Sequence, residues 1–574
     1  MFVVGKGALT LDGASPDISR VRDGLRVVIF EQTGKVLEKR FGFRTAEYGL
    51  RRVFKRVADH PLLAGITDAN LYNWRGDATV LPPRLTYELD YSPTVEWCGM
   101  RVKRGWRCGN RGNVASALIE KPAAGDFLPI LDGGYALQYA SLLEYREGAG
   151  MVLFCQADVT GRTEADPAAE TLVRNAIQYA ADWEPAPRRT AVYVGDAPGR
   201  EQLEAAGLTL APYEGGGLSA DQVLIVGKGG GRELAGSAPA IADWLRAGGH
   251  VLALGLDGDE ASSFLPFEVT TNSGEHIAAY FEPAQAATPL AGVAPADVHN
   301  RAPRELPLVT GGAVSVGDGV LARAEGLNVV FCQLTPQSVS PTLGVPTAFS
   351  AVVDEEGNPG ALVSLGPVTP GGASLGQWVA EAVAGKTYTL AVYARALGGD
   401  VSVHLGAERT PRPRWGVRYS PGESVGRGED VRISADEWTE LHTTFTVENP
   451  ADLRAYLGCT QPGARLRLRA FRMYPGDYSP AFEPADGNLL ANGDFASGER
   501  AWRFEFAQQR NVKRTYRRVS CLLTRLLANM GAAGQTKLLE HVSSPVADGE
   551  QRWLDGLYLD VPEAWDDPYR FFRW

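Results

Sequence analysis

The feature that most constrains this chain is a series of segments that occurs twice. The run FVVGKGAL from Phe2 has a counterpart in LIVGKGGG from Leu224, and GMVLFCQAD from Gly150 has one in LNVVFCQLT from Leu327. A third pair, HPLLAGITDANLYNWR and TPLAGVAPADVHNR, lies between them in both halves. Because the landmarks recur in the same order, we infer a duplicated domain.

Each copy alternates short apolar runs with amphipathic ones. In the second copy AVYVG, QVLIVG and HVLALGL are strand-like, and helical segments such as PAIADWLRAGG separate them. This rhythm is typical of an open, mostly parallel sheet covered by helices. We therefore predict two tandem α/β domains, at residues 1–186 and 187–338, and the first carries an insertion at about residues 76–130.

The two copies begin differently. A further strand–helix unit at Arg189–Tyr213 precedes the second copy, whereas the first starts directly with the strand Phe2–Val4. A parallel sheet that lacks such a unit exposes an edge and an uncovered apolar face. We therefore expect the first domain to be truncated and the chain to be the C-terminal part of a longer protein.

The texture of the sequence changes near residue 339. Short alternating runs such as TYTLAVYARAL and RLRLRAFRMY follow one another, separated by Gly, Pro, Asn and Asp. This spacing predicts an antiparallel β-sandwich over residues 339–484. Between Arg465 and Arg472 arginines alternate with apolar residues, with a slip near the end, which predicts one buried and one solvated face.

The last segment, residues 485–574, has a mixed character. Its opening NLLANGDFASGERAW is similar to the start of another jelly-roll module, but no run of strands follows. Val519, Leu522, Leu526 and their neighbours have helical spacing and predict an amphipathic helix. We expect the aromatic C-terminal tail, WDDPYRFFRW, to dock on a domain, because soluble proteins seldom expose aromatic patches.

Charge and composition restrict the classes of partner. The net charge of −11 disfavours nucleic acid and anionic membrane as general partners. The six cysteines show no CxxC spacing and the seven histidines no HExxH, so we predict neither a metal site nor a cofactor. Cys155 and Cys332 occupy equivalent apolar strands, where a buried thiol is the expected state.

The duplicated order of strands and helices resembles the class I glutamine amidotransferase-like fold, which includes ThuA-like proteins and the trimerisation domain of some β-galactosidases. Catalytic members carry a cysteine in a nucleophile elbow after a central strand and a later His-x-Glu pair. Here the matching strand ends read VVIFEQTG and LALGLDGD, without cysteine, and no His-x-Glu follows. The resemblance therefore implies silent domains without catalytic residues, and it makes a homo-oligomer a candidate assembly.

A crevice in the first α/β domain is the candidate ligand site there. Glu31 follows the central strand and Asp158 ends the late one, at the edge where open α/β sheets bind ligands. Trp97 and Trp106 lie among arginines in the insertion and could stack on sugars or nucleotides. The alternatives are structural: a salt bridge for Glu31, a cap or loop contact for Asp158, and hairpin packing for the tryptophans.

The sandwich resembles carbohydrate-binding jelly rolls of the CenC type in GQWVAEAVAGKTYTLAVYARAL, EWTELHTTFTV and RLRLRAFRMYPG. In that family a concave face carries aromatic residues. The resemblance makes Trp378, Tyr393, Trp415 and Tyr419 candidates for stacking on sugar rings.

Taken together, the arrangement resembles the C-terminal part of large bacterial glycoside hydrolases of the family 2 or β-galactosidase-like kind. The resemblance implies a non-catalytic, carbohydrate-binding accessory portion whose partners are a carbohydrate and an upstream catalytic domain, in an extracytoplasmic compartment. Two alternatives stay open. One is a free-standing ThuA-like or amidotransferase-like enzyme that uses the first domain, and the other is a structural or interaction scaffold.

Overall fold

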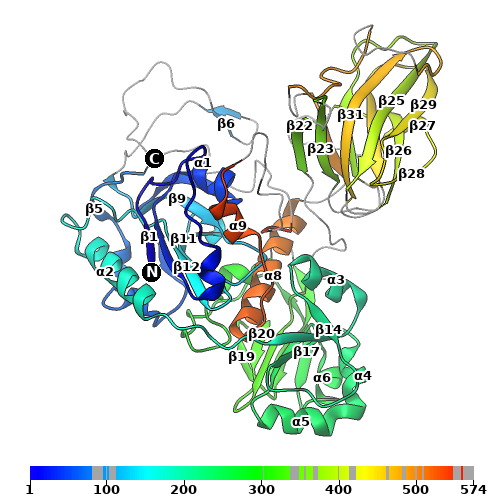
Figure 1. The fold of residues 1–574 in the computed structure, drawn as a ribbon. Helices are drawn as coiled ribbons and strands as arrows, with labels where there is room; N and C mark the ends of the chain where they lie inside the picture. The colour runs from blue at the N-terminus through cyan, green and yellow to red at the C-terminus, as the bar shows by residue number, and fades with distance from the viewer. Residues whose placement is uncertain are drawn as a thin grey trace. The chain divides into compact units, whose positions relative to one another are not determined.

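The computed structural model contains two compact units, which Figure 1 shows as a ribbon. It describes residues 1–80, 95–97, 100–102, 111–300, 303–335, 348–353, 357–365, 373–397, 400–412, 422–459, 464–480, 487–497, 501–506, 510–546, 552 and 557–559. The α/β unit comprises Met1–Ser340, Asn511–Val546 and Arg552–Trp574, and the sandwich unit comprises Pro341–Arg510 and Ala547–Gln551.

The first sheet of the α/β unit has eight strands of mixed direction. Its main path is β1 (Phe2–Val4), β2 (Arg26–Phe30), β12 (Gly150–Cys155), β11 (Tyr139–Glu147), β10 (Phe127–Gly133) and β4 (Phe54–Lys55). β9 (Ala115–Glu120) joins β11 to β3 (Thr45–Leu50). Only β1, β2 and β12 are parallel to one another, in two pairs, whereas five pairs are antiparallel, so the expectation of a mostly parallel sheet is wrong for this sheet. The short turn between β11 and β12 explains this, because only antiparallel strands can be joined so closely.

The second sheet has seven strands. Its order is β14 (Leu210–Pro212), β13 (Thr190–Val194), β15 (Gln222–Val226), β16 (His250–Leu254), β21 (Asn328–Cys332), β20 (Leu321–Arg323) and β19 (Val314–Val316). The first five are parallel and the last two antiparallel. Beside it, β17 (Thr270–His276) and β18 (Arg304–Gly311) form a separate pair, as do β5 (Trp74–Asp77) with β8 (Arg111–Gly112) and β6 (Val95–Trp97) with β7 (Met100–Val102).

The two sheets share a common series of strands. Phe30 of β2 pairs with Cys155 of β12, as Leu254 of β16 pairs with Cys332 of β21. Both cysteines are fully buried, which confirms the expected equivalent thiols. Burial raises the pKa of both, to about 12 for Cys332. The second sheet continues beyond β15 into β13 and β14, whereas the first ends at β1.

Helices cover both sheets. α2 (Pro167–Asp182) starts with Asp166 as its cap and Pro167 in its first turn, and it buries Leu172 and Ala176 in the first domain's core. The other α-helices of the unit are α1 (Gly34–Val36), α3 (Ala197–Ala205), α4 (Gly230–Leu234), α5 (Ala238–Arg246), α6 (Gly258–Ser262), α8 (Arg510–Asn529) and α9 (Leu538–Ser543). Short turns of helix are η1 (Ser19–Asp23), η2 (Leu37–Phe41), η3 (Pro61–Leu63), η4 (Asp68–Leu71), η5 (Tyr135–Leu137), η6 (Ala235–Ser237) and η7 (Pro295–Asp297).

The C-terminal segment returns to the α/β unit. In α8, Leu522, Leu523 and Leu526 are buried, as the helical spacing predicts. Tyr558 lies in the core of the first domain and its hydroxyl donates to the Glu120 carbonyl at 2.7 Å. Tail residues 560–574 lie outside the described chain. Within the part that the structure describes, no helix is both long and apolar enough to span a membrane.

The sandwich unit consists of two antiparallel sheets, as predicted. One has the order β22 (Ala348–Val353), β23 (Pro359–Leu365), β31 (Ala464–Pro475), β25 (Lys386–Ala396) and β29 (Thr439–Val447). The other has β27 (Glu423–Arg427), β26 (Val401–Arg409), β30 (Leu453–Cys459), β24 (Ala373–Trp378) and β32 (Arg503–Phe506), with β28 (Val431–Ile433) also paired to β26. Leu390, Leu405, Leu457 and Met473 pack in one core between them.

The slip predicted in β31 is a β-bulge. Leu466 and Leu468 point into the core, but Ala470 has φ 51° and the pairing with β25 breaks there. Beyond the bulge the alternation shifts by one residue. As a result both Arg469 and Arg472 lie over the ring of Tyr393, at 5.5 and 5.2 Å.

The sandwich continues beyond residue 484. Leu490, Phe495 and Trp502, from the stretch that resembles the start of another module, are buried in the same core. β32 then pairs with β24. These residues complete the existing sandwich because their apolar side chains have a core to enter there.

Candidate functional site

One surface of the sandwich, the outward side of the six-stranded sheet, combines aromatic, glycine and paired charged residues. Leu375, Leu405 and Leu457 of this sheet point into the core, so their neighbours along each strand point outward. By register, three rows cross β24, β30 and β26: Ser374, Gly458 and His404; Gly376, Tyr456 and Gly406; Trp378, Arg454 and Glu408. We call these residues the tyrosine face.

Tyr456 lies between two glycines on the neighbouring strands. A Cβ at Gly406 would stand 2.6 Å from the Tyr456 ring, so the ring lies across that glycine. A Cβ at Gly458 would likewise stand 2.6 Å from the His404 ring. Glycine inside a strand often marks such a close approach. Tyr456 is partly exposed, whereas Gly376, Gly406 and Gly458 are buried.

Arg454 is fully buried beside Tyr456, in the same outward row as Trp378 and Glu408. Its Nη1 donates to Glu408 Oε1 at 2.9 Å and its Nη2 to Ser374 Oγ at 3.0 Å. Its guanidinium lies 5.5 Å from the centroids of both Trp378 and Tyr456. Buried charges persist when they are paired and hydrogen-bonded, and the cation adds attraction to both rings. The two aromatic side chains are therefore held in fixed positions.

The rings of Trp378 and Tyr456 differ in the contacts that they make with their neighbours. Trp378 donates its Nε1 proton to the Thr410 carbonyl at 2.8 Å and lies between Arg454 and Arg412, the latter at 5.9 Å. Tyr456 has the edge of His404 beside it, with centroids 5.9 Å apart and planes at 88°. We infer that Trp378 forms a wall and that Tyr456 is the residue best placed for stacking.

His404 supplies a neutral polar group at the margin of the face. Its Nδ1 lies 3.0 Å from Asp430 Oδ1, which also accepts a hydrogen bond from Arg427 at 3.0 Å. Burial, and then the charge of Arg427, lowers the pKa of His404 below its ordinary value. The imidazole is therefore neutral near pH 7, and the only full charges of the tyrosine face are the paired Arg454 and Glu408.

The structure separates the sugar-stacking residues expected from the sequence. Trp378 belongs to the tyrosine face, whereas Tyr393 lies on β25 of the other sheet. Trp415 and Tyr419 fall outside the described residues. Tyr456 and Arg454 were missed, and the available signal was the glycine at Gly376, Gly406 and Gly458 inside strand patterns.

The structure brings the two expected crevice carboxylates of the first domain near each other, both fully buried. Thr160 donates to Glu31 through its backbone N and its Oγ1, each at 2.7 Å. Thr79 donates to Asp158 in the same way, at 2.6 and 2.8 Å. Burial raises the pKa of Glu31, and the charge of Asp158 adds to this. Each carboxylate orders a loop.

The side chains of the two tryptophans expected in the same crevice, Trp97 and Trp106, fall outside what the structure describes. Trp106 lies outside the described residues, and of Trp97 the structure describes only its backbone in β6. The turn after the central strand holds Glu31 in the first copy and Gly255 in the second, with no cysteine at either. In the described ranges no group of three or more His, Cys, Asp and Glu side chains is arranged to hold a metal ion.

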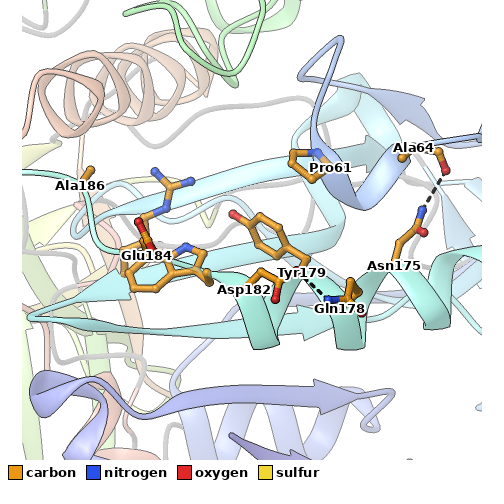
Figure 2. A pocket seen from close by; sticks show the side chains of 10 residues that line it. Pro61, Ala64, Asn175, Gln178, Tyr179, Asp182, Glu184 and Ala186 are labelled. Carbon is orange, nitrogen blue, oxygen red and sulfur yellow. Dashed lines mark hydrogen bonds between the residues drawn. The ribbon is translucent and has the colours of Figure 1, made fainter.

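A hollow of about 490 Å³ lies beside α2, with Pro61, Tyr179 and Asp182 along it (Figure 2). Beneath it the buried Glu144 accepts hydrogen bonds from Tyr179 Oη at 2.8 Å, Trp183 Nε1 at 2.9 Å and Arg146 Nε at 2.6 Å. Burial alone would raise the pKa of Glu144, but Arg146 and His60 hold it well below its ordinary value. These polar groups satisfy one another, so we interpret them as a stabilising network.

Comparisons with known proteins give structural neighbours but no family. No family model and no curated protein matches the chain. A CBM4 structure is similar with 16% identity and a TM-score of 0.18, over 23% of this chain and 81% of that one. The CBM22-1 xylan-binding domain from Paenibacillus barcinonensis Xyn10C has 14% identity and 0.19, over 23% and 83%. The N-terminal cellulose-binding domain of Cellulomonas fimi β-1,4-glucanase C has 15% and 0.16, over 23% and 91%.

Proposed function

We propose that the sandwich unit binds neutral carbohydrate on the tyrosine face, as the non-catalytic accessory part of a carbohydrate-active protein. The observation that carries this proposal is the partly exposed Tyr456 between Gly376 and Gly406, with its ring 5.5 Å from the guanidinium of the buried Arg454. A sugar ring has a flat apolar side, and an aromatic ring of fixed orientation can exclude water from it at little cost in side-chain entropy.

The polar groups around Tyr456 suit sugar hydroxyls. Glu408 is a carboxylate acceptor, His404 is a neutral imidazole, and Ser374 carries a hydroxyl. Hydroxyls both donate and accept hydrogen bonds, so a site with mixed donors and acceptors can recognise them. Because Arg454 is paired with Glu408, these two charges do not by themselves favour an anion or a cation.

We extend the proposal to the protein as a whole. The two α/β domains would be silent amidotransferase-like domains, with limits at 1–186 and 187–338. The chain would serve a β-galactosidase-like glycoside hydrolase whose catalytic barrel lies elsewhere, outside the cytoplasm. The buried thiols Cys155 and Cys332 support the absence of catalysis by cysteine in these domains. Burial raises their pKa values, and a thiol reacts as the thiolate. The loop contacts of Glu31 and Asp158 weigh against the enzyme alternative.

Titration calorimetry of the full chain with xylohexaose and cellohexaose tests the tyrosine face. We expect Tyr456→Ala to weaken binding by about tenfold or more, the loss of one stacked aromatic contact. Tyr393→Ala, on the other sheet, is the matched control and should bind as the wild type. Equal affinity in the wild type and Tyr456→Ala, or no binding of either neutral sugar, would contradict the proposal.

A further inference from the structure

A second hollow, on the α/β unit, is surrounded by arginines. It measures about 540 Å³ and is lined by Arg51, Asn73, Trp74, Arg75, Gly76, Asp77, Arg111 and Gly112. We call it the arginine hollow. The residues come from the β5–β8 pair and the adjoining segment at Arg51, which the fold brings together from distant parts of the sequence.

The backbone of this hollow is fixed from below. The buried Arg162 donates to the Arg75 carbonyl through Nη2 at 2.9 Å and Nε at 3.1 Å, and to the Asn113 carbonyl through Nη1 at 2.5 Å. Its guanidinium lies 5.6 Å from the ring centroid of Trp74. One buried cation thus holds both β5 and the segment after β8, so the hollow is a built feature of the domain.

A hydrogen bond fixes the orientation of one of the arginine side chains that line the hollow. Arg51 donates from Nε to Asn73 Oδ1 at 3.1 Å, which orients its guanidinium. Gly112 has φ 77°, and a Cβ there would stand 2.3 Å from Asn73 Oδ1. The glycine is therefore required for this close approach of the two strands.

The hollow has an excess of positive charge. Arg51, Arg75 and Arg111 are exposed, and among the lining residues Asp77 is the acid that opposes them. Arg111 Nε lies 3.5 Å from Asp77 Oδ1, with the two side chains 89% and 60% exposed. Exposed pairs of this kind hold each other weakly. The local excess contrasts with the net charge of −11 for the chain.

The position of the hollow suits a ligand. Thr79, just beyond β5, is held by Asp158 in the loop that follows the parallel strand β12. Open α/β sheets bind ligands at the carboxyl ends of their parallel strands. The volume also falls within the range of about 300–1,000 Å³ that is usual for small-molecule sites.

We propose that the arginine hollow binds the acidic groups, carboxylate or sulfate, of an anionic glycan. The planar guanidinium group can donate two parallel hydrogen bonds to such groups, and three arginines line this hollow. The choice of a glycan rests on the function proposed for the tyrosine face. The alternative polyanion, single-stranded nucleic acid, is bound mainly by stacking, and the lining aromatic Trp74 is 2% exposed.

Binding of the full chain to a hexamer of galacturonate, to dextran sulfate and to dextran tests the site. The first carries carboxylate, the second sulfate and the third neither, so the acid group is identified by the tighter ligand. In buffer of low ionic strength we expect Arg75→Gln to weaken acidic-glycan binding about tenfold, and Arg75→Lys to weaken it less. Arg174→Gln, an exposed arginine of α2 paired with Glu170, is the matched control and should have no effect.

Three outcomes would overturn the inference. The first is that the chain binds neither acidic glycan. The second is that Arg75→Gln and Arg111→Gln both bind the acidic glycans as tightly as the wild type does. The third is that a thymidine 20-mer binds more tightly than the acidic glycans and that this binding depends on the same arginines. The variant Tyr456→Ala separates the two proposals, because it should weaken xylohexaose binding by about tenfold or more and leave acidic-glycan binding intact. A chain that binds galacturonate through Arg75 but no neutral sugar would refute the tyrosine face alone.

Discussion

The two sheets of the α/β unit have different side chains at equivalent positions of the strand series that they share. In the first, Glu31, Glu144 and Asp158 are fully buried carboxylates. The equivalent positions of the second, by pairing register, are Gly255, the exposed Arg323 and Thr335. Each buried acid has donors of its own: Thr160 for Glu31, Tyr179 and Trp183 for Glu144, and Thr79 for Asp158.

This difference shows that the order of the strands does not determine which of these positions holds a buried carboxylate. A buried carboxylate is tolerated where neighbouring loops and helices bring donors to it, because an unpaired buried charge is very costly. We therefore expect the first domain to respond to the loss of single charges and to pH, and the second to respond mainly to changes in packing.

The largest effect should come from Glu144. Replacing it by Gln removes the charge that pairs with Arg146 and leaves part of a buried network unsatisfied, so we expect a loss of about 3–5 kcal/mol of local stability. Hydrogen-exchange protection of β11 and β12 peptides measures this. The control is Arg323→Gln at the equivalent position, which should change protection of β20 and β21 by less than about 0.5 kcal/mol. Equal effects would remove the contrast between the domains.

Acid titration sharpens the same contrast. The pKa of Glu144 is lowered in the folded state, so its contribution is present above the ordinary pKa near 4.5 and lost as pH falls through the folded value. The pKa of Glu31 is raised, so its contribution is present below 4.5 and lost as pH rises through the folded value. The stability of wild type relative to Glu31→Gln should therefore fall from pH 4 to pH 7, as measured by exchange in β2. A constant difference over this range would contradict the assignment.

The smallest effect concerns the turn after the central strand of the second domain. Gly255 has φ 64°, and a Cβ there would stand 3.0 Å from Thr335 Cγ2. Because an alanine at this φ is strained, Gly255→Ala should lower the free energy of unfolding by about 1 kcal/mol. The equivalent residue of the first sheet, Glu31, does not have a left-handed backbone conformation. Thermal unfolding measures the shift. Gly236→Ala, where a Cβ would meet open space, is the control and should unfold at or above the wild-type temperature.

The sequence predicted those features that repeat or alternate along the chain. The duplication located the equivalent buried residues Cys155 and Cys332, and the alternation in β31 predicted the buried leucines and a slip near its end, although Arg472, expected on the solvated face, is buried. Helical spacing predicted the buried face of α8. In each case the physical signal, a period of two or of 3.6 residues, lies within a single segment.

The binding surfaces lacked such local signals. Tyr456 is significant because Gly376 and Gly406 lie beside it on other strands, and these positions are related only by register. Likewise the pairing of β5 with β8 brings Arg75 and Arg111 to one hollow, which Arg51 also lines. The mixed direction of the first sheet was also missed, because repeat matching reports which segments recur and not how their neighbours are connected.

One amide occurs at the same place in both domains. Gln156 Nε2 donates to the Gln32 carbonyl at 2.9 Å, and Gln333 Nε2 donates to the Leu256 carbonyl at 3.1 Å. In each domain a side chain from the adjacent strand thus secures the main chain of the turn beyond β2 or β16. This shared contact holds both turns although their residues differ, with Glu31 and Gln32 in the first and Gly255 and Leu256 in the second. These two turns are accordingly the natural places to introduce a new reactive group by design.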